Sequence, residues 1–271
     1  MRHLTGVRYA TPLREGGSLP AIVETESGEL FVVKFLGAGQ GQRALIAEAL
    51  AAALAVELDL PVAEPAIIDL DDGFGRSEPD PEIQDILKKS RGANFGLAYI
   101  SGALPFDPVI NRAIDPTLAA DIVWFDALIT NVDRTPRNVN LLMRGDGLWM
   151  IDHGAALYFH HRWEGWQERV QARFPQIKDH VLLHLAGDLV EADRRLRPQL
   201  TAAVLEKVVA QIPSDWLGDE ELFADLESHR RAYADYLGAR LNGPRAWLDE
   251  AVAAKALEPQ KHVTRVTRRV V

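Results

Sequence analysis

The feature that most constrains this fold is a change of hydrophobic pattern along the 271-residue chain. The first third consists of short apolar runs separated by turn residues, a pattern typical of β-strands. After residue 107, apolar residues recur instead at helical spacing. This order predicts an α+β fold, with a small antiparallel sheet and one helix first and a larger, mainly helical part second. A cleft between the two parts is the expected site of binding.

The first part contains clear boundaries between its expected elements. A glycine-rich stretch leads into the helix, and prolines follow that helix. One face of the helix carries Leu45, Ala49, Leu50 and Ala53 at helical spacing. The pattern predicts strands at 7–13, 21–25, 30–35, 66–70 and 95–100, a long helix at 42–58 and a short helix at 83–89. The last of these strands connects the two parts.

The second part begins with a strong helix signal. Asp115 is a favourable N-cap, and Pro116 fits the first turn. A short hairpin is expected around residues 140–151, and residues 167–254 are expected to be almost entirely helical. We therefore predict an N-terminal lobe at 1–100, a helical lobe at 101–258 and a basic tail at 259–271.

Charge and composition exclude several classes of function. The formal net charge of -9 argues against a general nucleic-acid binder. The absence of cysteine excludes disulfides, cysteine-ligated zinc and thiol nucleophiles. The N-terminus lacks a signal peptide, and the longest apolar run, 49–56, is too short for a membrane span. We expect a soluble, cytoplasmic protein with no nucleic-acid or membrane partner.

The most informative stretch runs from Asn131 to Asn138, after one predicted helix and before the predicted hairpin. Phosphoryl transfer needs a carboxylate for the acceptor hydroxyl, and an amide and a second carboxylate for magnesium. In kinases four residues separate the base from the amide, and the second ligand lies in an Asp-x-Gly after a hairpin. Asp133 and Asn138 have that spacing, and Asp152 of an Asp-His-Gly sequence follows 14 positions later. The pattern predicts a phosphotransferase site.

Lys34 supports this prediction because it lies in an apolar strand of the first part, where it can reach nucleotide phosphates. A carboxylate is then expected to hold it. Glu48, on the next helix and 14 residues later, is preferred over Glu57, since a carboxylate at a helix C-terminus is disfavoured. The turn that contains Gly16, Gly17 and Ser18 is a candidate to cover the phosphates with backbone N–H groups.

These motifs resemble those of the HipA-like kinases. The resemblance rests on Asn-x-Asp-x4-Asn, Ile-Asp-x-Gly, a Val-Val-Lys-Phe strand and a Glu-bearing helix that ends in Leu-Pro-Val. It implies a two-lobed protein-kinase-like fold, shared with the phosphatidylinositol kinases, and Ser/Thr protein kinase activity with ATP and magnesium as cofactors. It assigns roles to the residues as follows: Asp133 is the base, Asn138 and Asp152 are metal ligands, Lys34 binds phosphate, Glu48 holds Lys34, and a hinge at 97–100, with Leu97 and Tyr99, contacts adenine.

The chain departs from the resembled proteins in two places. It begins too close to the kinase core for the N-terminal subdomain of full-length HipA toxins, which argues against a toxin–antitoxin role and an antitoxin partner. His153 replaces the Phe of the usual Asp-Phe-Gly sequence.

Two other functions remain open. Aminoglycoside and choline kinases use the same metal chemistry but carry His-Gly-Asp at the base, where this chain has Asn131-Val132-Asp133. A nucleotide-binding pseudokinase is the second alternative, and the complete set of polar site residues argues against it.

The phosphoacceptor is the least constrained feature. Arg134 and Arg137 flank Asp133, so they either make the floor of the cleft positive or pair with acidic residues of the helical part. We expect a Ser or Thr hydroxyl on a protein, and Ser18 is a candidate for self-phosphorylation.

Overall fold

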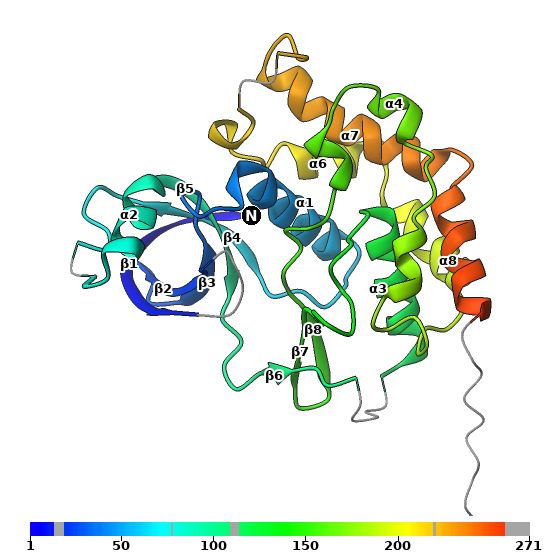
Figure 1. The fold of residues 1–271 in the computed structure, drawn as a ribbon, viewed down its shortest axis with the longest axis horizontal. Coiled ribbons are helices and arrows are strands. Elements are labelled where there is room, and N and C mark those ends of the chain that lie inside the picture. The colour runs from blue at the N-terminus through cyan, green and yellow to red at the C-terminus, as the bar shows by residue number, and fades with distance from the viewer. Residues whose placement is uncertain (14–18, 77, 109–113, 219–220, 258–271) are drawn as a thin grey trace, which may run out of the picture.

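The computed structural model describes residues 1–13, 19–76, 78–108, 114–218 and 221–257. Its first part is a closed barrel with the strand order β1-β2-β3-β5-β4, drawn at the left of Figure 1. The strands are β1 (Arg2–Pro12), β2 (Ala21–Thr25), β3 (Leu30–Lys34), β4 (Pro65–Leu70) and β5 (Gly92–Ala98). All neighbours pair antiparallel except β1 and β4, which pair in parallel. The predicted antiparallel sheet is therefore present, but this parallel pairing, which local patterns do not reveal, closes it.

Alternation along the strands fills the interior of the barrel. Phe31 and Val33 of β3 are fully buried, whereas Lys34 at its end is half-buried and belongs to the opposite face. Helix α2 (Pro81–Lys89) lies beside the barrel and contributes Leu87 to the same core. Its side-chain cap, Asp80, accepts a hydrogen bond from the backbone of the first turn.

Helix α1 (Gly41–Glu57) lies between the barrel and the helical part, as Figure 1 shows. Every residue from Ala44 to Ala55 is buried, so the helix is enclosed on all faces and not only on the predicted apolar one. It packs against β4 and β5 on the barrel side, and against α6 (Ala202–Val209) and the 3₁₀ helix η4 (Ser214–Trp216) on the other. Many of its residues are alanines, whose small side chains allow this close approach from both sides.

The second part is built around α3 (Pro116–Leu128), whose N-cap Asp115 accepts a hydrogen bond from the Thr117 amide over 3.0 Å. The other helices are α4 (Trp166–Arg169), α5 (Leu189–Leu196), α6, α7 (Leu226–Asn242) and α8 (Ala246–Leu257). The prediction of nearly continuous helix at 167–254 was wrong for 170–188, which contain only the 3₁₀ helix η2 (Pro175–Asp179). This segment lacks the regular hydrogen bonds of an α-helix and is held in place by buried side chains such as Ile177 and Leu182.

A small second sheet consists of β6 (Leu104–Pro105), β7 (Leu141–Arg144) and β8 (Gly147–Met150). At its end the Met150 amide donates to the carbonyl of Pro61, just after α1, over 2.7 Å. This hydrogen bond joins the end of β8 to the segment between α1 and β4. In the described part of the chain, no helix combines the length and the apolar character needed to cross a membrane.

Candidate active site

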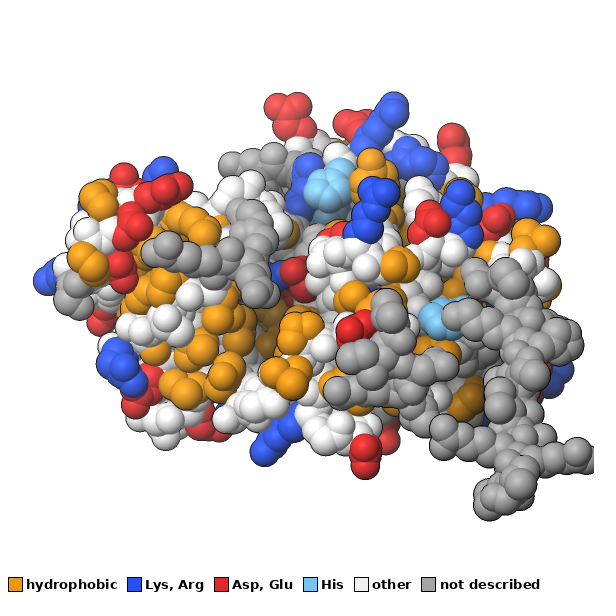
Figure 2. Space-filling view, turned by 60° about the horizontal axis from the view of Figure 1, so that its bottom comes forward, with side chains coloured by type: hydrophobic (Ala, Val, Ile, Leu, Met, Phe, Trp, Pro, Cys, Tyr) orange, Lys and Arg blue, Asp and Glu red, His pale blue; other side chains and the backbone are white. Residues whose placement is uncertain are grey.

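The structure brings Lys34, Glu48 and Asp152 into one ionic cluster, although they lie on three separate elements. The Nζ of Lys34 donates to Oε1 of Glu48 and, over 2.5 Å, to Oδ1 of Asp152. The side chain of Glu48 is completely buried and that of Lys34 is 12% exposed, whereas that of Asp152 is 39% exposed. The cluster is therefore closed on the α1 side and open to solvent at Asp152. Figure 2 shows side chains of both charges in the hollow between the barrel and the helical part.

Glu57, the other partner considered for Lys34, lies elsewhere. Its Oε1 accepts a hydrogen bond from Lys207 over 2.6 Å. Glu48 instead lies on the buried stretch of α1 and accepts a hydrogen bond from Lys34 at the end of β3. The preference for Glu48 over Glu57, which rested on the unfavourable position of a carboxylate at a helix C-terminus, is confirmed.

The backbone at Asp152 adopts the left-handed conformation, with φ 54°. Such a conformation is uncommon for a residue other than glycine. Gly154 follows closely, and a Cβ there would lie 3.2 Å from Oε1 of Glu48. The Asp-x-Gly pattern therefore has a steric reason: the glycine lets the chain pass against the buried carboxylate.

The charges of the cluster determine its titration. Burial disfavours the ammonium of Lys34, but the adjacent carboxylates of Glu48 and Asp152 outweigh it and raise the pKa of Lys34. Complete burial raises the pKa of the Glu48 carboxyl, which must also share Lys34 with a second carboxylate. Although burial favours the neutral form of Asp152, contact with Lys34 lowers its pKa. The pKa values of the two carboxyls that share Lys34 are therefore shifted in opposite directions.

His153 occupies the position at which the usual Asp-Phe-Gly sequence has a phenylalanine. Its imidazole ring is completely buried. Burial lowers the pKa of His153 to about 3. Its ring packs edge-on against Phe125, with 6.4 Å between centroids. Within the described residues neither ring nitrogen has a hydrogen-bond partner, and Nδ1 lies 3.9 Å from Oε2 of Glu48. His153 is consequently a neutral packing residue.

Asp133 and Asn138 meet in a tight loop between α3 and β7. Nδ2 of Asn138 donates to Oδ2 of Asp133 over 2.6 Å. Two reciprocal backbone hydrogen bonds between Thr135 and Asn138 close the loop. Asn131 accepts from the amide of Asp133 over 3.1 Å, and Asn140 donates to its carbonyl over 3.2 Å. The loop therefore presents the carboxylate and the amide side by side.

A buried network lies beneath this loop, and it decides between the two alternatives that the sequence left open for Arg134. Arg134 is 1% exposed, and its Nε donates to Oδ2 of the fully buried Asp126 over 2.5 Å. His180 and Asn131 also donate to this carboxylate, over 2.9 and 3.1 Å. The alternative in which Arg134 makes the cleft floor positive was wrong, because its charge is neutralised in the interior, whereas Arg137 is exposed. A signal available in the sequence was Asp126 itself, which with Asp121 is one of two acidic residues in a largely apolar helix.

Arg134 also connects the two halves of the site. Its NH1 donates to the carbonyls of Asn140 and Ile151, the latter over 3.2 Å. The Ile151 amide in turn donates to the Asn140 carbonyl over 3.1 Å. Ile151 directly precedes Asp152, so the loop of Asp133 and the cluster of Lys34 belong to one continuous site.

The donor set fits a magnesium ion. Nδ2 of Asn138 is used by Asp133, and among the described residues no donor contacts its Oδ1. Asp152 keeps an exposed carboxylate. Two oxygen ligands suit magnesium, which takes its other ligands from phosphate and water. In the described residues no group of three or more His, Asp or Glu side chains is arranged to hold a metal by itself.

The remaining predicted contacts are not all placed. Gly16, Gly17 and Ser18 lie outside the described residues, as does the basic tail. Leu97 is 8% exposed within β5, and Tyr99 is 41% exposed, with its amide donating to the Leu30 carbonyl over 2.8 Å. Contact of these two residues with adenine stays a prediction.

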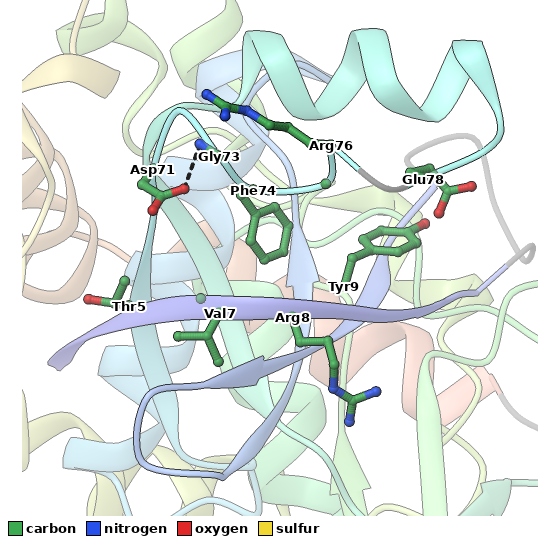
Figure 3. A pocket seen from close by; sticks show the side chains of 11 residues that line it. Thr5, Val7, Arg8, Tyr9, Asp71, Gly73, Phe74, Arg76 and Glu78 are labelled. Atoms are coloured by element: carbon green, nitrogen blue, oxygen red, sulfur yellow. Dashed lines mark hydrogen bonds between the residues drawn. The ribbon is translucent and has the colours of Figure 1, made fainter.

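Hollows elsewhere on the molecule do not contain these residues. A cavity of about 520 Å³ lies between β1 and the segment after β4. Tyr9, Phe74 and Glu78 are among the residues that line it (Figure 3). It includes none of Lys34, Asp133 and Asp152. The polar cluster, and not the size of a hollow, therefore identifies the candidate active site.

Comparisons with known proteins show the family and the fold of the chain. A family model described as HipA-like kinase matches residues 7–247. The structure is similar to that of a proinflammatory kinase, CtkA, of Helicobacter pylori, with a TM-score of 0.57 and 12% sequence identity over 93% of this chain and 99% of that chain. At this identity the likeness shows a shared fold. No curated protein matches the chain. Since the family model spans most of the sequence, the chain belongs to the HipA-like kinase family.

Proposed function

We propose that this protein is an ATP- and magnesium-dependent kinase that phosphorylates a Ser or Thr hydroxyl on a protein. In this proposal the barrel and the helical part act as the two lobes of a protein-kinase-like fold. The observation that carries it is the contact of Lys34 with both Glu48 and Asp152, joined through Arg134 to the loop of Asp133 and Asn138. A phosphate-binding cation, two metal ligands and a carboxylate base are the groups that phosphoryl transfer requires.

Each residue has one role in the proposed reaction. Lys34, held by Glu48, binds phosphate oxygens. Asn138 and Asp152 hold magnesium, which when bound neutralises charge on those oxygens. Asp133 orients the acceptor hydroxyl and accepts its proton. The hydroxyl oxygen bonds to the γ-phosphorus, the bond from that phosphorus to the bridging oxygen breaks, and ADP leaves.

The openness of the site supports a protein as acceptor. Pro136, Arg137 and Asn138 at the tip of the catalytic loop are exposed, and Asp133 is half-buried. A Ser or Thr on a protein surface can reach such a loop. Arg137 is available to pair with a phosphate or carboxylate near the acceptor. Ser18 is proposed as a site of self-phosphorylation. We propose no direct nucleic-acid partner and no membrane partner.

Intact-mass and peptide mass spectrometry after incubation with ATP and magnesium tests the proposal. We expect phosphate on Ser or Thr of this protein or of an added protein mixture. The Asp133→Asn variant should transfer on the order of 10² to 10⁴ times more slowly. Turnover of an amino sugar or choline without protein phosphorylation would favour a small-molecule kinase. Binding of ATP without any turnover would favour a pseudokinase.

A further inference from the structure

One guanidinium contacts both segments that carry the functional carboxylates. Arg134 directly follows Asp133 in sequence, and its side chain donates to the carbonyl of Ile151, directly before Asp152, over 3.2 Å. The same NH1 group donates to the carbonyl of Asn140. Asp152 is thus one residue away from a carbonyl that this side chain holds, and Asp133 is one residue away from Arg134 itself.

The guanidinium is fixed from its other side. Its Nε lies 2.5 Å from Oδ2 of Asp126, and both side chains are completely buried. His180 donates through Nε2 to the same carboxylate over 2.9 Å, while its Nδ1 accepts from the Leu182 amide over 3.1 Å. Because Asp126, His180 and Leu182 are buried and joined by hydrogen bonds, the planar guanidinium of Arg134 has little freedom to rotate.

We infer that Arg134 is a positioning residue that sets the distance between the base Asp133 and the metal ligand Asp152. The inference rests on the proposed function, in which these two carboxylates act on the same phosphate. Arg134 reaches neither substrate nor metal in this account. It acts by holding the Asn140 and Ile151 carbonyls together, so that the two carboxylates keep one fixed separation. Misplacement of catalytic groups by about 1 Å can cost 10²-fold in rate.

A second buried arginine provides a matched control. Arg240 is also 1% exposed, and it donates to the carbonyls of Leu128, Ala127 and Val170 over 2.8 to 3.0 Å. None of these acceptors lies in the catalytic loop or the segment of Asp152. Arg240→Lys therefore removes a buried guanidinium that binds backbone carbonyls, as Arg134 does, but leaves the contacts of the candidate active site unchanged.

Hydrogen exchange measured by mass spectrometry on the ligand-free protein tests the connection without any nucleotide or metal. Arg134→Lys keeps the positive charge but cannot form the planar fork. We expect faster exchange in peptides covering 133–140 and 151–154 together, and unchanged exchange in both for Arg240→Lys. Unchanged exchange at 151–154 in Arg134→Lys, or an equal increase in Arg240→Lys, would overturn the inference.

Kinetics supply the functional part of the test. The Arg134→Lys enzyme should lose on the order of 10²-fold in kcat, with a KM for ATP within about twofold of wild type, because the contact of Lys34 with Glu48 is untouched. A rise in KM with unchanged kcat contradicts the inference. If Arg134→Lys does not fold, Asp126→Asn with Arg134→Met replaces it, since this pair leaves no buried charge unpaired. The double variant should show the same exchange and the same loss of kcat.

The exchange and kinetic results separate the inference from the proposed function. If Arg134→Lys shows the coupled increase in exchange but the wild-type protein transfers no phosphate to any acceptor, the proposed function is rejected and the structural connection made by Arg134 remains. An active wild type in which Arg134→Lys keeps full kcat rejects the inference and leaves the proposed function in place.

Discussion

Two completely buried carboxylates in this molecule have opposite surroundings. Asp126 accepts hydrogen bonds from Arg134, His180 and Asn131. Burial opposes its charge, but Arg134 and His180 outweigh burial and lower the pKa of Asp126. Glu48 has only Lys34 as a cation, and its Oε2 has no hydrogen-bond partner in the described part of the chain. Its burial raises its pKa.

The difference distinguishes a fully paired network from an incompletely paired one. The Asp126 network is complete, so nothing further needs to bind there, and its role is to hold the loops above it. The Lys34 cluster combines two carboxylates with one ammonium and opens to solvent at Asp152. An incomplete, partly exposed cluster of this kind is where a cation and phosphates can add ligands. Buried polar clusters are therefore better compared by completeness than by charge alone.

The largest predicted effect is on the complete network. Asp126→Asn should lower the free energy of unfolding by about 3 to 5 kcal/mol, because Arg134 then keeps a buried charge without its counter-ion. Urea unfolding followed by circular dichroism measures this. A loss below about 1 kcal/mol would mean that the network does not support the fold, and would remove the contrast with Glu48.

The next effect concerns function in the incomplete cluster. Lys34→Met should reduce kcat/KM for ATP on the order of 10²-fold, about 2.7 kcal/mol, through loss of phosphate binding. Lys34→Met combined with Glu48→Ala should be little worse, because Glu48 acts through Lys34. Steady-state assays over a range of ATP concentrations decide this. Losses that add would show that the two residues act independently.

A smaller effect is expected from pH. Burial lowers the pKa of His160 well below its ordinary value of 6.5, and burial lowers that of His180 despite Asp126. Below pH 6.5 these histidines bind protons in the unfolded chain but not in the folded one. The free energy of unfolding should therefore fall as pH falls. For His160 the slope is about 1.4 kcal/mol per pH unit.

Melting temperatures between pH 7 and pH 5 test this prediction. His160→Phe should make the decline shallower, while a change at the exposed His3, such as His3→Gln, should leave it as in wild type. A decline that is the same in His160→Phe as in wild type would exclude His160 as its source.

The smallest effect is the stability change at Glu48. Glu48→Gln should alter the free energy of unfolding by less than about 1 kcal/mol, because burial already favours the neutral carboxyl and Lys34 keeps Asp152 as its partner. Paired urea curves with Asp126→Asn make the comparison direct. Similar large losses in both variants would show that the two carboxylates are equivalent supports.

Local patterns predicted much of this fold, and long-range pairing accounts for most of what they missed. Strand β2 has the predicted bounds, and the N-cap at Asp115 is present, because alternation and capping depend on neighbouring residues. The parallel pairing of β1 with β4 was not predicted, because the sequence of a strand does not indicate which other strand it pairs with.

The same distinction holds for the site. The spacing from Asp133 to Asn138 and the position of Lys34 were evident from sequence because they are fixed within short segments. The burial of Arg134 against Asp126 and His180 was not, because it depends on how α3 packs against the 170–188 segment. The turn of Gly16, Gly17 and Ser18 lies outside the described residues, so its contact with phosphate stays a prediction.

The most direct test of the central claim measures ATP binding by calorimetry, with and without magnesium, in wild type and in Asp152→Ala. The account predicts that wild type binds ATP more tightly with magnesium. Asp152→Ala should lose that gain while keeping its affinity for metal-free ATP, since Lys34 remains paired with Glu48. An equal loss of affinity with and without magnesium, or no loss in either, would contradict the assignment of Asp152 as the metal ligand of a kinase site.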